Sequence, residues 1–296
     1  MTSSSKLVFF GTEDFRLHTL AALVEHGYDI VAVVTKPDAR RGRKSELVMP
    51  SVKKYAIEHD IPVLQPTKVG EITDELAELK ADAAVLVSYG KLIPKRTIDL
   101  FNPIGIINIH PSLLPRYRGP APIEAAIVNG DSETGISIMR LTLGMDEGPV
   151  FVQERIALSG NETKPQLYDA FARRGAELLM TTLPDILSGT LQPKQQENDD
   201  VSYTSLLTKQ DGVLDPITDD AYACERKVRA YLGYPKTTVK LQNNDVLVTS
   251  AKVVTTKSPD ELVIECAQNT LLQVDELVAP SGKKMSGSAY LRGYAR

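Results

Sequence analysis

The stretch KLVFFGTEDFRLHTLAALVEHGYDIVAVVT, Lys6 to Thr35, indicates the fold class. It opens with a continuous apolar run, Lys6 to Phe10, which is typical of a strand buried on both faces. Apolar residues then recur at helical spacing, and Gly27 stands where a helix C-terminus favours glycine. A second apolar run covers Ile30 to Thr35. The order strand, helix, strand predicts an α/β fold with a mostly parallel sheet.

The same alternation continues beyond this unit. The pattern predicts further strands at Ala83 to Val87 and Gly105 to His110, helices at Ser51 to His59, Pro122 to Gly130 and Pro165 to Leu187, and two strands, Gly135 to Leu141 and Pro149 to Leu158. Ser51 is the expected N-cap of its helix. Ligands of such sheets bind at the carboxyl ends of the strands, where we expect Ser88, Tyr89 and His110.

The composition of the sequence changes after Gly189, which divides the chain into two parts. Residues 190–205 are polar without a hydrophobic period, which predicts a linker between a catalytic domain, 1–189, and a second domain, 206–296. The second part contains one helix, about Asp219 to Leu232, followed by short strands with hairpin signals such as Asn243-Asn244. This pattern predicts a small β-barrel.

Composition narrows the class of protein. The net charge of -4 and the pI near 5.7 argue against bulk electrostatic binding of nucleic acid, but they leave room for a local basic patch. The two cysteines, Cys224 and Cys266, form no CxxC pair, so we expect no disulfide framework, no zinc site and a reducing cytoplasm. No secretory signal or membrane span is predicted.

The polar residues of the strand ending at His110 are the first candidates for chemistry. Strand alternation places Asn108 and His110 on one face, where a neutral amide and an ionisable imidazole could meet an oxyanion. The alternative is a histidine that bonds a nearby carbonyl, and the residues alone leave both readings open. The chain has no GxGxxG, no GxxxxGK[ST] and no HExxH.

Two loops carry further candidates. Asp146, in LTLGMDEGPV, lies between glycines and could orient a histidine, although a solvated turn acid is the commoner case. The long loop from Pro37 to Pro50 is basic in an acidic protein, which suits phosphate contacts; the alternative is a solvated charge run. Its cations are Arg40, Arg41, Arg43 and Lys44.

Taken together, these residues resemble a known family. INIHPSLLPRYRGPAPIEAAIVNGDSETGISIM is similar to the signature region of the 10-formyltetrahydrofolate-dependent formyltransferases. TKPDARRGRKSELVMPSVKKYA resembles a loop that the tRNA-modifying members insert after their second strand, and ADAAVLVSYGKLIPK resembles their pterin-pocket strand. Weaker matches, LLTKQDGVLD, KVRAYLGYP and GKKMS, extend the resemblance to nearly the whole chain.

The resemblance implies a Rossmann-like formyltransferase domain followed by an OB-like barrel, and a catalytic trio of Asn108, His110 and Asp146. The implied reaction transfers the formyl group of 10-formyltetrahydrofolate to the α-amine of methionine on initiator tRNA, without a metal. The implied enzyme is a cytoplasmic monomer that binds tRNA through the basic loop. The expected folate-binding residues are Leu86, Val87, Ser88, Tyr89, Gly90, Ser112, Leu113, Leu114, Pro115, Leu143 and Gly144.

Other functions stay open at this point. A sugar-nucleotide N-formyltransferase would share the trio but has less need of the basic loop. A single-domain formyltransferase acting on glycinamide ribonucleotide would lack the residues beyond about 205, and a folate hydrolase would need no amine acceptor. A non-catalytic RNA-binding protein with an OB-like module is the alternative from another class.

Overall fold

The computed structural model describes residues 5–12, 17–41, 46–197, 199–242 and 244–294. By their internal contacts they form two compact units. Unit 1 contains residues 1–118, 135–156 and 168–203, and unit 2 contains residues 119–134, 157–167 and 204–296. This division differs from the domain bounds expected above, because residues 190–203 contact unit 1 and two internal segments contact the C-terminal part.

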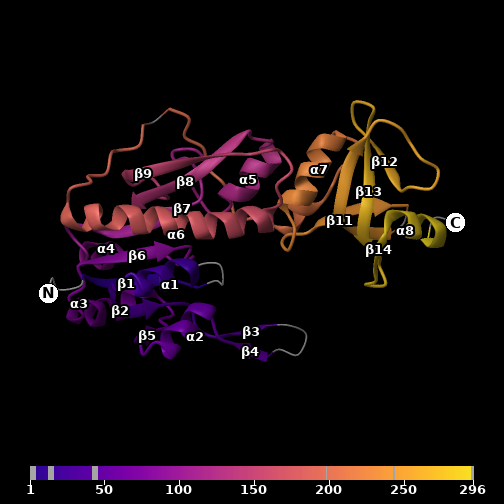
Figure 1. The fold of residues 1–296 in the computed structure, drawn as a ribbon. Helices are drawn as coiled ribbons and strands as arrows, with labels where there is room; N and C mark the ends of the chain where they lie inside the picture. Colours follow the sequence, from indigo (N-terminus) through magenta and orange to yellow (C-terminus); the bar gives the residue numbers. More distant parts are fainter. Residues whose placement is uncertain (1–4, 13–16, 42–45, 198, 243, 295–296) are drawn as a thin grey trace. The chain divides into compact units, whose positions relative to one another are not determined.

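A seven-stranded sheet organises unit 1 (Figure 1). Its strands are β1 (Lys6–Gly11), β2 (Asp29–Val34), β5 (Val63–Leu64), β6 (Ala83–Val87), β7 (Ile106–His110), β8 (Glu133–Arg140) and β9 (Val150–Ala157). They lie in the order β5-β2-β1-β6-β7-β8-β9. The pairs from β5 to β7 are parallel and β8 pairs antiparallel with β7, so the predicted mostly parallel sheet is confirmed.

The strands of this sheet are buried on both faces, which explains why apolar runs in the sequence predicted their positions. The side chains of β6 and β7 are buried without exception, and β6 has the predicted bounds. Phe10 packs edge-on against the rings of Tyr89 and Phe101, with centroids 5.5 Å and 6.3 Å apart. These aromatic contacts fill the core beside β1 and β6.

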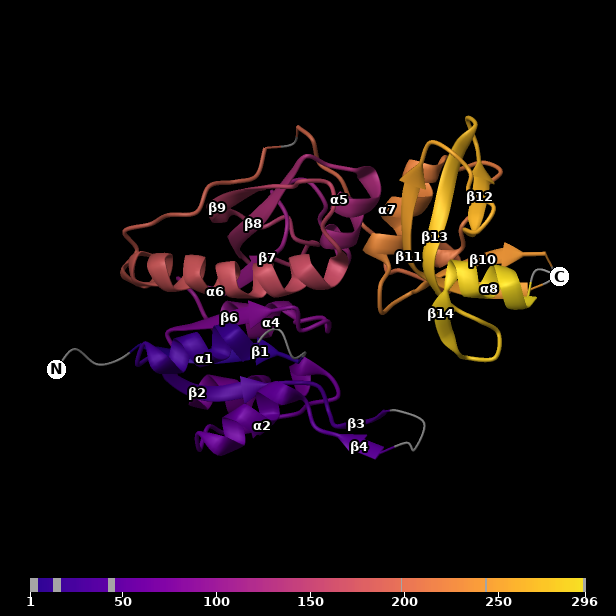
Figure 2. The ribbon, with the colours of Figure 1, turned by 45° about the vertical axis from the view of Figure 1, so that its right-hand side comes forward.

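Helices flank this sheet. They include α1 (Leu17–Glu25), α2 (Ser51–Glu58), α3 (Thr73–Glu78), α4 (Lys95–Asp99) and the 25-residue α6 (Lys164–Ser188). Helix α6 lies along one face, as Figures 1 and 2 show. A Cβ built on Gly175 of α6 would lie only 2.9 Å from Cγ2 of Ile109 in β7, so this face allows no larger residue without movement.

Helix α2 corrects one prediction. The helix begins at Ser51, but its N-cap is Pro50 and no side chain caps it. Pro50 has φ -55°, which already suits the start of a helix, so Ser51 lies inside the first turn. The Ser51 hydroxyl is buried and has no hydrogen-bond partner among the described residues.

A two-stranded hairpin was not predicted. Strands β3 (Ala39–Arg41) and β4 (Glu46–Val48) pair antiparallel within the long basic loop. In both views the hairpin projects from the sheet (Figures 1 and 2). At its base Asp38 accepts hydrogen bonds from Lys53 and Gln65, which hold the pKa of this carboxyl below its usual range.

Unit 2 is built on a curled antiparallel sheet. It contains α5 (Pro122–Asn129), α7 (Ala221–Ala230), α8 (Gly287–Tyr294), β10 (Thr237–Leu241), β11 (Asn244–Val254), β12 (Val263–Cys266), β13 (Thr270–Val278) and β14 (Lys284–Ser286). Its order is β10-β11-β13-β12, with β14 on β13. Asn243 of the expected turn lies outside the described residues, but β10 and β11 form the predicted hairpin.

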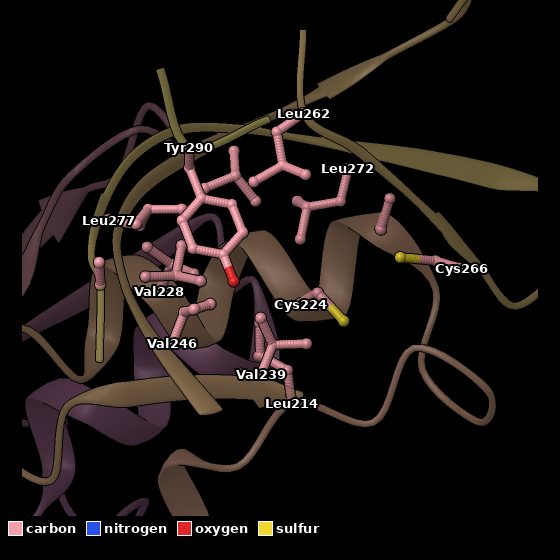
Figure 3. Close-up of a cluster of buried hydrophobic side chains, with 14 residues drawn as sticks. Leu214, Cys224, Val228, Val239, Val246, Leu262, Cys266, Leu272, Leu277 and Tyr290 are labelled. Carbon is pink, nitrogen blue, oxygen red and sulfur yellow. The ribbon is translucent and has the colours of Figure 1, made fainter. Parts of the chain in front are cut away.

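Apolar side chains from α7, α8 and the strands meet in the core of unit 2. Figure 3 shows Val228, Leu272 and Tyr290 in this cluster, with Cys224 and Cys266 among its members. Both thiols are buried and free of disulfides. Burial raises the pKa of the Cys224 thiol to about 12. No helix of the described residues is long and apolar enough to cross a membrane.

Candidate active site

Strand β7 presents two of the predicted residues at its carboxyl end. Asn108 and His110 are buried, with 5% and 4% of their surfaces exposed. Ile109, between them, points the other way, toward Gly175 of α6. Within the part of the chain that the structure describes, no hydrogen bond of the Asn108 side chain occurs. Its amide N–H groups are therefore available to a ligand oxygen.

The loop between β8 and β9 brings Asp146 to the same place. Its Oδ2 atom lies 3.6 Å from Nδ1 of His110, although many residues separate them in the sequence. Asp146 has a φ of +49°, a left-handed conformation uncommon outside glycine. Gly148 lets the loop close on β8, because a Cβ there would lie 1.9 Å from the carbonyl oxygen of Arg140.

The other ring nitrogen of His110 is also engaged. Nε2 lies 2.9 Å from the carbonyl oxygen of Tyr117. A carbonyl only accepts, so Nε2 carries hydrogen in this arrangement. A neutral ring would then present a lone pair at Nδ1 to the Asp146 carboxylate. Only the doubly protonated ring donates toward both partners, and that form brings a positive charge beside the Asn108 amide.

The loop after β7 is fixed by buried hydroxyls. Ser137 of β8 donates to the carbonyl oxygen of Ser112 at 2.6 Å and accepts from the amide of Leu114 at 3.1 Å. The Ser112 hydroxyl donates to the carbonyl oxygen of Arg116, so this predicted folate residue uses its side chain within the loop. Gln153 donates to the Leu114 carbonyl oxygen at 2.8 Å. The segment Ser112 to Pro115 is therefore preshaped.

The other residues that were predicted to bind folate differ in how far they are exposed to solvent. Leu86, Val87 and Tyr89 are buried, whereas Ser88 is half-buried and Gly90 exposed. Burial raises the pKa of the Tyr89 phenol to about 12, and its hydroxyl has no partner among the described residues. Leu143 is 65% exposed, and Gly144 and Leu113 are half-buried.

Two of the four predicted tRNA contacts, Arg40 and Arg41, belong to strand β3. Arg40 is exposed there, and the backbone of Arg41 is in β3. Arg43 and Lys44 lie outside the described residues. No cluster of His, Cys, Asp and Glu suited to a metal occurs among the residues that the structure describes.

Sequence reasoning missed the residues that support the trio. Gln196 donates from Nε2 to the carbonyl oxygens of Asp146 and Gly148, at 2.7 Å and 2.8 Å. Its Oε1 atom accepts from Arg118, which is buried. A lone glutamine in a polar segment carries no signal of this role, and the polar segment itself predicted a linker.

Both halves of the chain match known protein families. The chain matches the formyl transferase family model over residues 5–183 and the formyl transferase C-terminal domain model over residues 206–295. It is 37% identical to a methionyl-tRNA formyltransferase of Myxococcus xanthus, covering 99% of this chain and 96% of that protein. It is 36% identical to one of Halorhodospira halophila, covering 98% and 96%.

Solved structures share the fold. An N-formyltransferase from Helicobacter canadensis, solved with folinic acid and dTDP-3-aminofucose, matches with a TM-score of 0.72 and 18% identity, covering 91% of this chain and 98% of that one. A methionyl-tRNA formyltransferase from Clostridium thermocellum matches with a TM-score of 0.59 and 14% identity, covering 96% and 100%.

Proposed function

The chain belongs to the formyl transferase family, and we propose that it transfers the formyl group of 10-formyltetrahydrofolate to the α-amine of methionyl-tRNA. Its curated relatives, 35–37% identical over nearly their full length, are named for this reaction. The structural observation that carries the proposal is the contact of His110 with Asp146 at the end of β7, with the buried Asn108 two residues earlier in the same strand.

The reaction makes specific demands on this site. The neutral amine attacks the formyl carbon, and the carbonyl oxygen becomes an oxyanion. The new C–N bond forms, the bond from carbon to N10 of the folate breaks, and one proton passes from the amine to N10. The site must stabilise negative charge and accept a proton, which are tasks for fixed donors and a nearby carboxylate.

Each member of the trio has a role in this scheme. The Asn108 amide donates to the oxyanion. His110 would contribute positive charge in its doubly protonated form, the form in which both ring nitrogens donate toward their partners. Asp146 keeps that charge in place, and its carboxylate, 17% exposed, accepts the amine proton through water. Loss of one oxyanion donor costs about 10²–10³-fold in rate.

Folate recognition falls to the preshaped loop and the end of β6. Backbone groups of Ser112 to Pro115 would contact the folate, and Leu86 to Gly90 with Leu143 and Gly144 would border the pterin. A loop already fixed by hydrogen bonds to Ser137 loses little further entropy on binding.

The acceptor tRNA would contact the basic loop through Arg40, Arg41, Arg43 and Lys44, of which Arg40 and Arg41 belong to β3. We assign residues 1–189 to the catalytic domain, 190–205 to the connection and 206–296 to the second domain. The family matches over residues 5–183 and 206–295 support this order, and residues 190–203 of the connection pack with unit 1. The free thiols of Cys224 and Cys266 suit a cytoplasmic enzyme.

One assay tests the proposed function against its alternative. Two reactions are set up, each with the protein and 10-formyltetrahydrofolate. One contains methionyl-tRNA as the acceptor, and the other contains a dTDP-linked amino sugar. We expect formylmethionyl-tRNA only, and a loss of about 10²–10³-fold in turnover for Asn108→Ala. Formylation of the sugar alone would establish the alternative, and normal turnover by Asn108→Ala would remove Asn108 from the mechanism.

A further inference from the structure

We propose that Gln196 is a positioning residue that holds the Asp146 carboxylate against His110. The inference rests on the proposed function for its catalytic consequence. Gln196 belongs to the polar segment 190–203, which forms part of unit 1. Its hydrogen bonds to the Asp146 loop go to backbone carbonyl oxygens, so its action on the His110–Asp146 pair is indirect.

The first support is the double contact that Gln196 makes with the Asp146 loop. One amide nitrogen, Nε2, donates to the carbonyl oxygens of Asp146 and Gly148, and both bonds are shorter than 2.9 Å. An amide NH₂ has two hydrogens, so these two carbonyls use its whole donor capacity. The bonds bracket the left-handed turn at Asp146, whose conformation is uncommon and needs surrounding structure to persist.

The second support is the fixed orientation of the glutamine. Its Oε1 atom accepts from Nε of Arg118 at 3.0 Å and from Nη2 at 2.8 Å. The guanidinium also donates from Nη1 to the Tyr203 hydroxyl at 3.0 Å. Arg118 has 6% of its surface exposed, so a rigid cationic fork selects one orientation of the amide, with its nitrogen toward the loop.

The same segment also reaches the histidine. Ser202 accepts at its hydroxyl oxygen from the Tyr117 amide at 2.9 Å, and its carbonyl oxygen accepts from the Arg118 amide at 2.9 Å. Tyr117 supplies the carbonyl that binds Nε2 of His110. Segment 190–203 therefore holds the backbone on both sides of the His110–Asp146 pair, through Gln196 on one side and Ser202 on the other.

Two substitutions separate the contacts of Gln196. Gln196→Ala removes all of them. Gln196→Glu keeps acceptor atoms for Arg118 but offers no N–H to the carbonyls of Asp146 and Gly148. The matched control is Gln195→Ala, since Gln195 is the exposed neighbour in the same segment.

Kinetics provide the first measurement. For both Gln196 variants we expect kcat for methionyl-tRNA to fall about 10- to 100-fold, because a displaced catalytic group costs about that much. KM for both substrates should stay within about twofold of the wild-type value, and Gln195→Ala should match wild type. Full kcat in Gln196→Glu would overturn the inference, since the contact with Arg118 alone would then suffice.

A second measurement does not depend on the reaction. The chain has four histidines, so the ring ¹⁵N and ¹H resonances of His110 can be assigned by their absence in His110→Ala. At one fixed pH, we expect these resonances to shift in both Gln196 variants and not in Gln195→Ala. Unchanged resonances would overturn the inference even if the proposed reaction were correct. Shifted resonances in a protein that formylates no methionyl-tRNA would overturn the proposed reaction and leave the positioning role standing.

Discussion

The Nε2 atom of His110 lies 2.9 Å from the carbonyl oxygen of Tyr117, and this contact sets the direction of the imidazole. In this orientation of the ring, Nδ1 faces Oδ2 of Asp146, 3.6 Å away. Tyr117 itself has a φ of +56°, an outlier for an aromatic residue. Asp146 and Ser88 share this left-handed conformation, at +49° and +44°. Left-handed residues thus lie on both sides of the imidazole, because Tyr117 bonds Nε2 and Asp146 faces Nδ1.

The charge of Asp146 is the first point to test. Asp146→Asn keeps the size of the side chain but removes the negative charge that faces the imidazole. We expect kcat to fall about 10²–10³-fold, comparable with the loss of one oxyanion donor, while KM for both substrates changes little. Glu147→Gln is the control, because Glu147 is an exposed acid in the same loop. Equal losses in the two variants would contradict a specific role for Asp146.

Much of this fold could be predicted because its strands are buried on both faces. The run Ala83 to Val87 is uniformly apolar, and the strand has those bounds. Short elements escaped prediction for the opposite reason. β5 has two residues, and β3, β4 and β14 have three each, so no hydrophobic period can develop in them.

The candidate site was predictable only in part. Asn108 and His110 are linked by strand alternation, which is a local pattern. The approach of Asp146 depends on the loop between β8 and β9, and only the family resemblance connected it with His110. The supports at Gln196 and Ser202 depend on hydrogen bonds to backbone groups of distant segments, such as that from Gln196 Nε2 to the Asp146 carbonyl oxygen. Such bonds leave no mark on residue periodicity.

The folate loop gives a second prediction. Ser137→Ala removes the acceptor of the Leu114 amide and the donor to the Ser112 carbonyl oxygen, in a position with no exposed surface. The loop would then have to be ordered by the ligand, so we expect KM for 10-formyltetrahydrofolate to rise about tenfold, equivalent to about 1.4 kcal/mol. KM for tRNA should not change. Ser132→Ala, at an exposed serine, is the control; an unchanged folate KM in Ser137→Ala would show that the loop needs no such support.

The basic hairpin gives a third prediction, measured through salt. Arg40→Glu should raise KM for tRNA and flatten its dependence on salt, because fewer counterions are released from the tRNA on binding. KM for the folate should stay constant. Lys6→Glu makes the same charge change at the amino end of β1, opposite the edge at which His110 lies, and should leave both constants unchanged. A tRNA KM that is independent of salt in the wild-type protein would contradict the proposed contact.

The buried Tyr89 predicts how stability depends on pH. Burial raises the pKa of its phenol to about 12, against about 10 for an exposed tyrosine. Below pH 10 the phenol is protonated in the folded and unfolded states alike, so it adds no pH dependence. Between pH 10 and 12 the unfolded chain loses a proton that the folded chain keeps. The free energy of unfolding should therefore decrease as pH rises through this window.

Comparison with Tyr89→Phe isolates the contribution of the phenol to this pH dependence. The buried thiols, which also have raised pKa values, are present in both proteins and contribute equally. At pH 7 the variant should be about 1 kcal/mol more stable, because the Tyr89 hydroxyl is buried without a partner among the described residues. Above pH 10 the advantage should grow. Urea unfolding at pH 7 and pH 10.5, in the presence of a reductant, measures both effects. Tyr222→Phe, at a residue 56% exposed, should change neither value. A less stable Tyr89→Phe at pH 7 would mean that the hydroxyl contributes a favourable hydrogen bond in the folded protein.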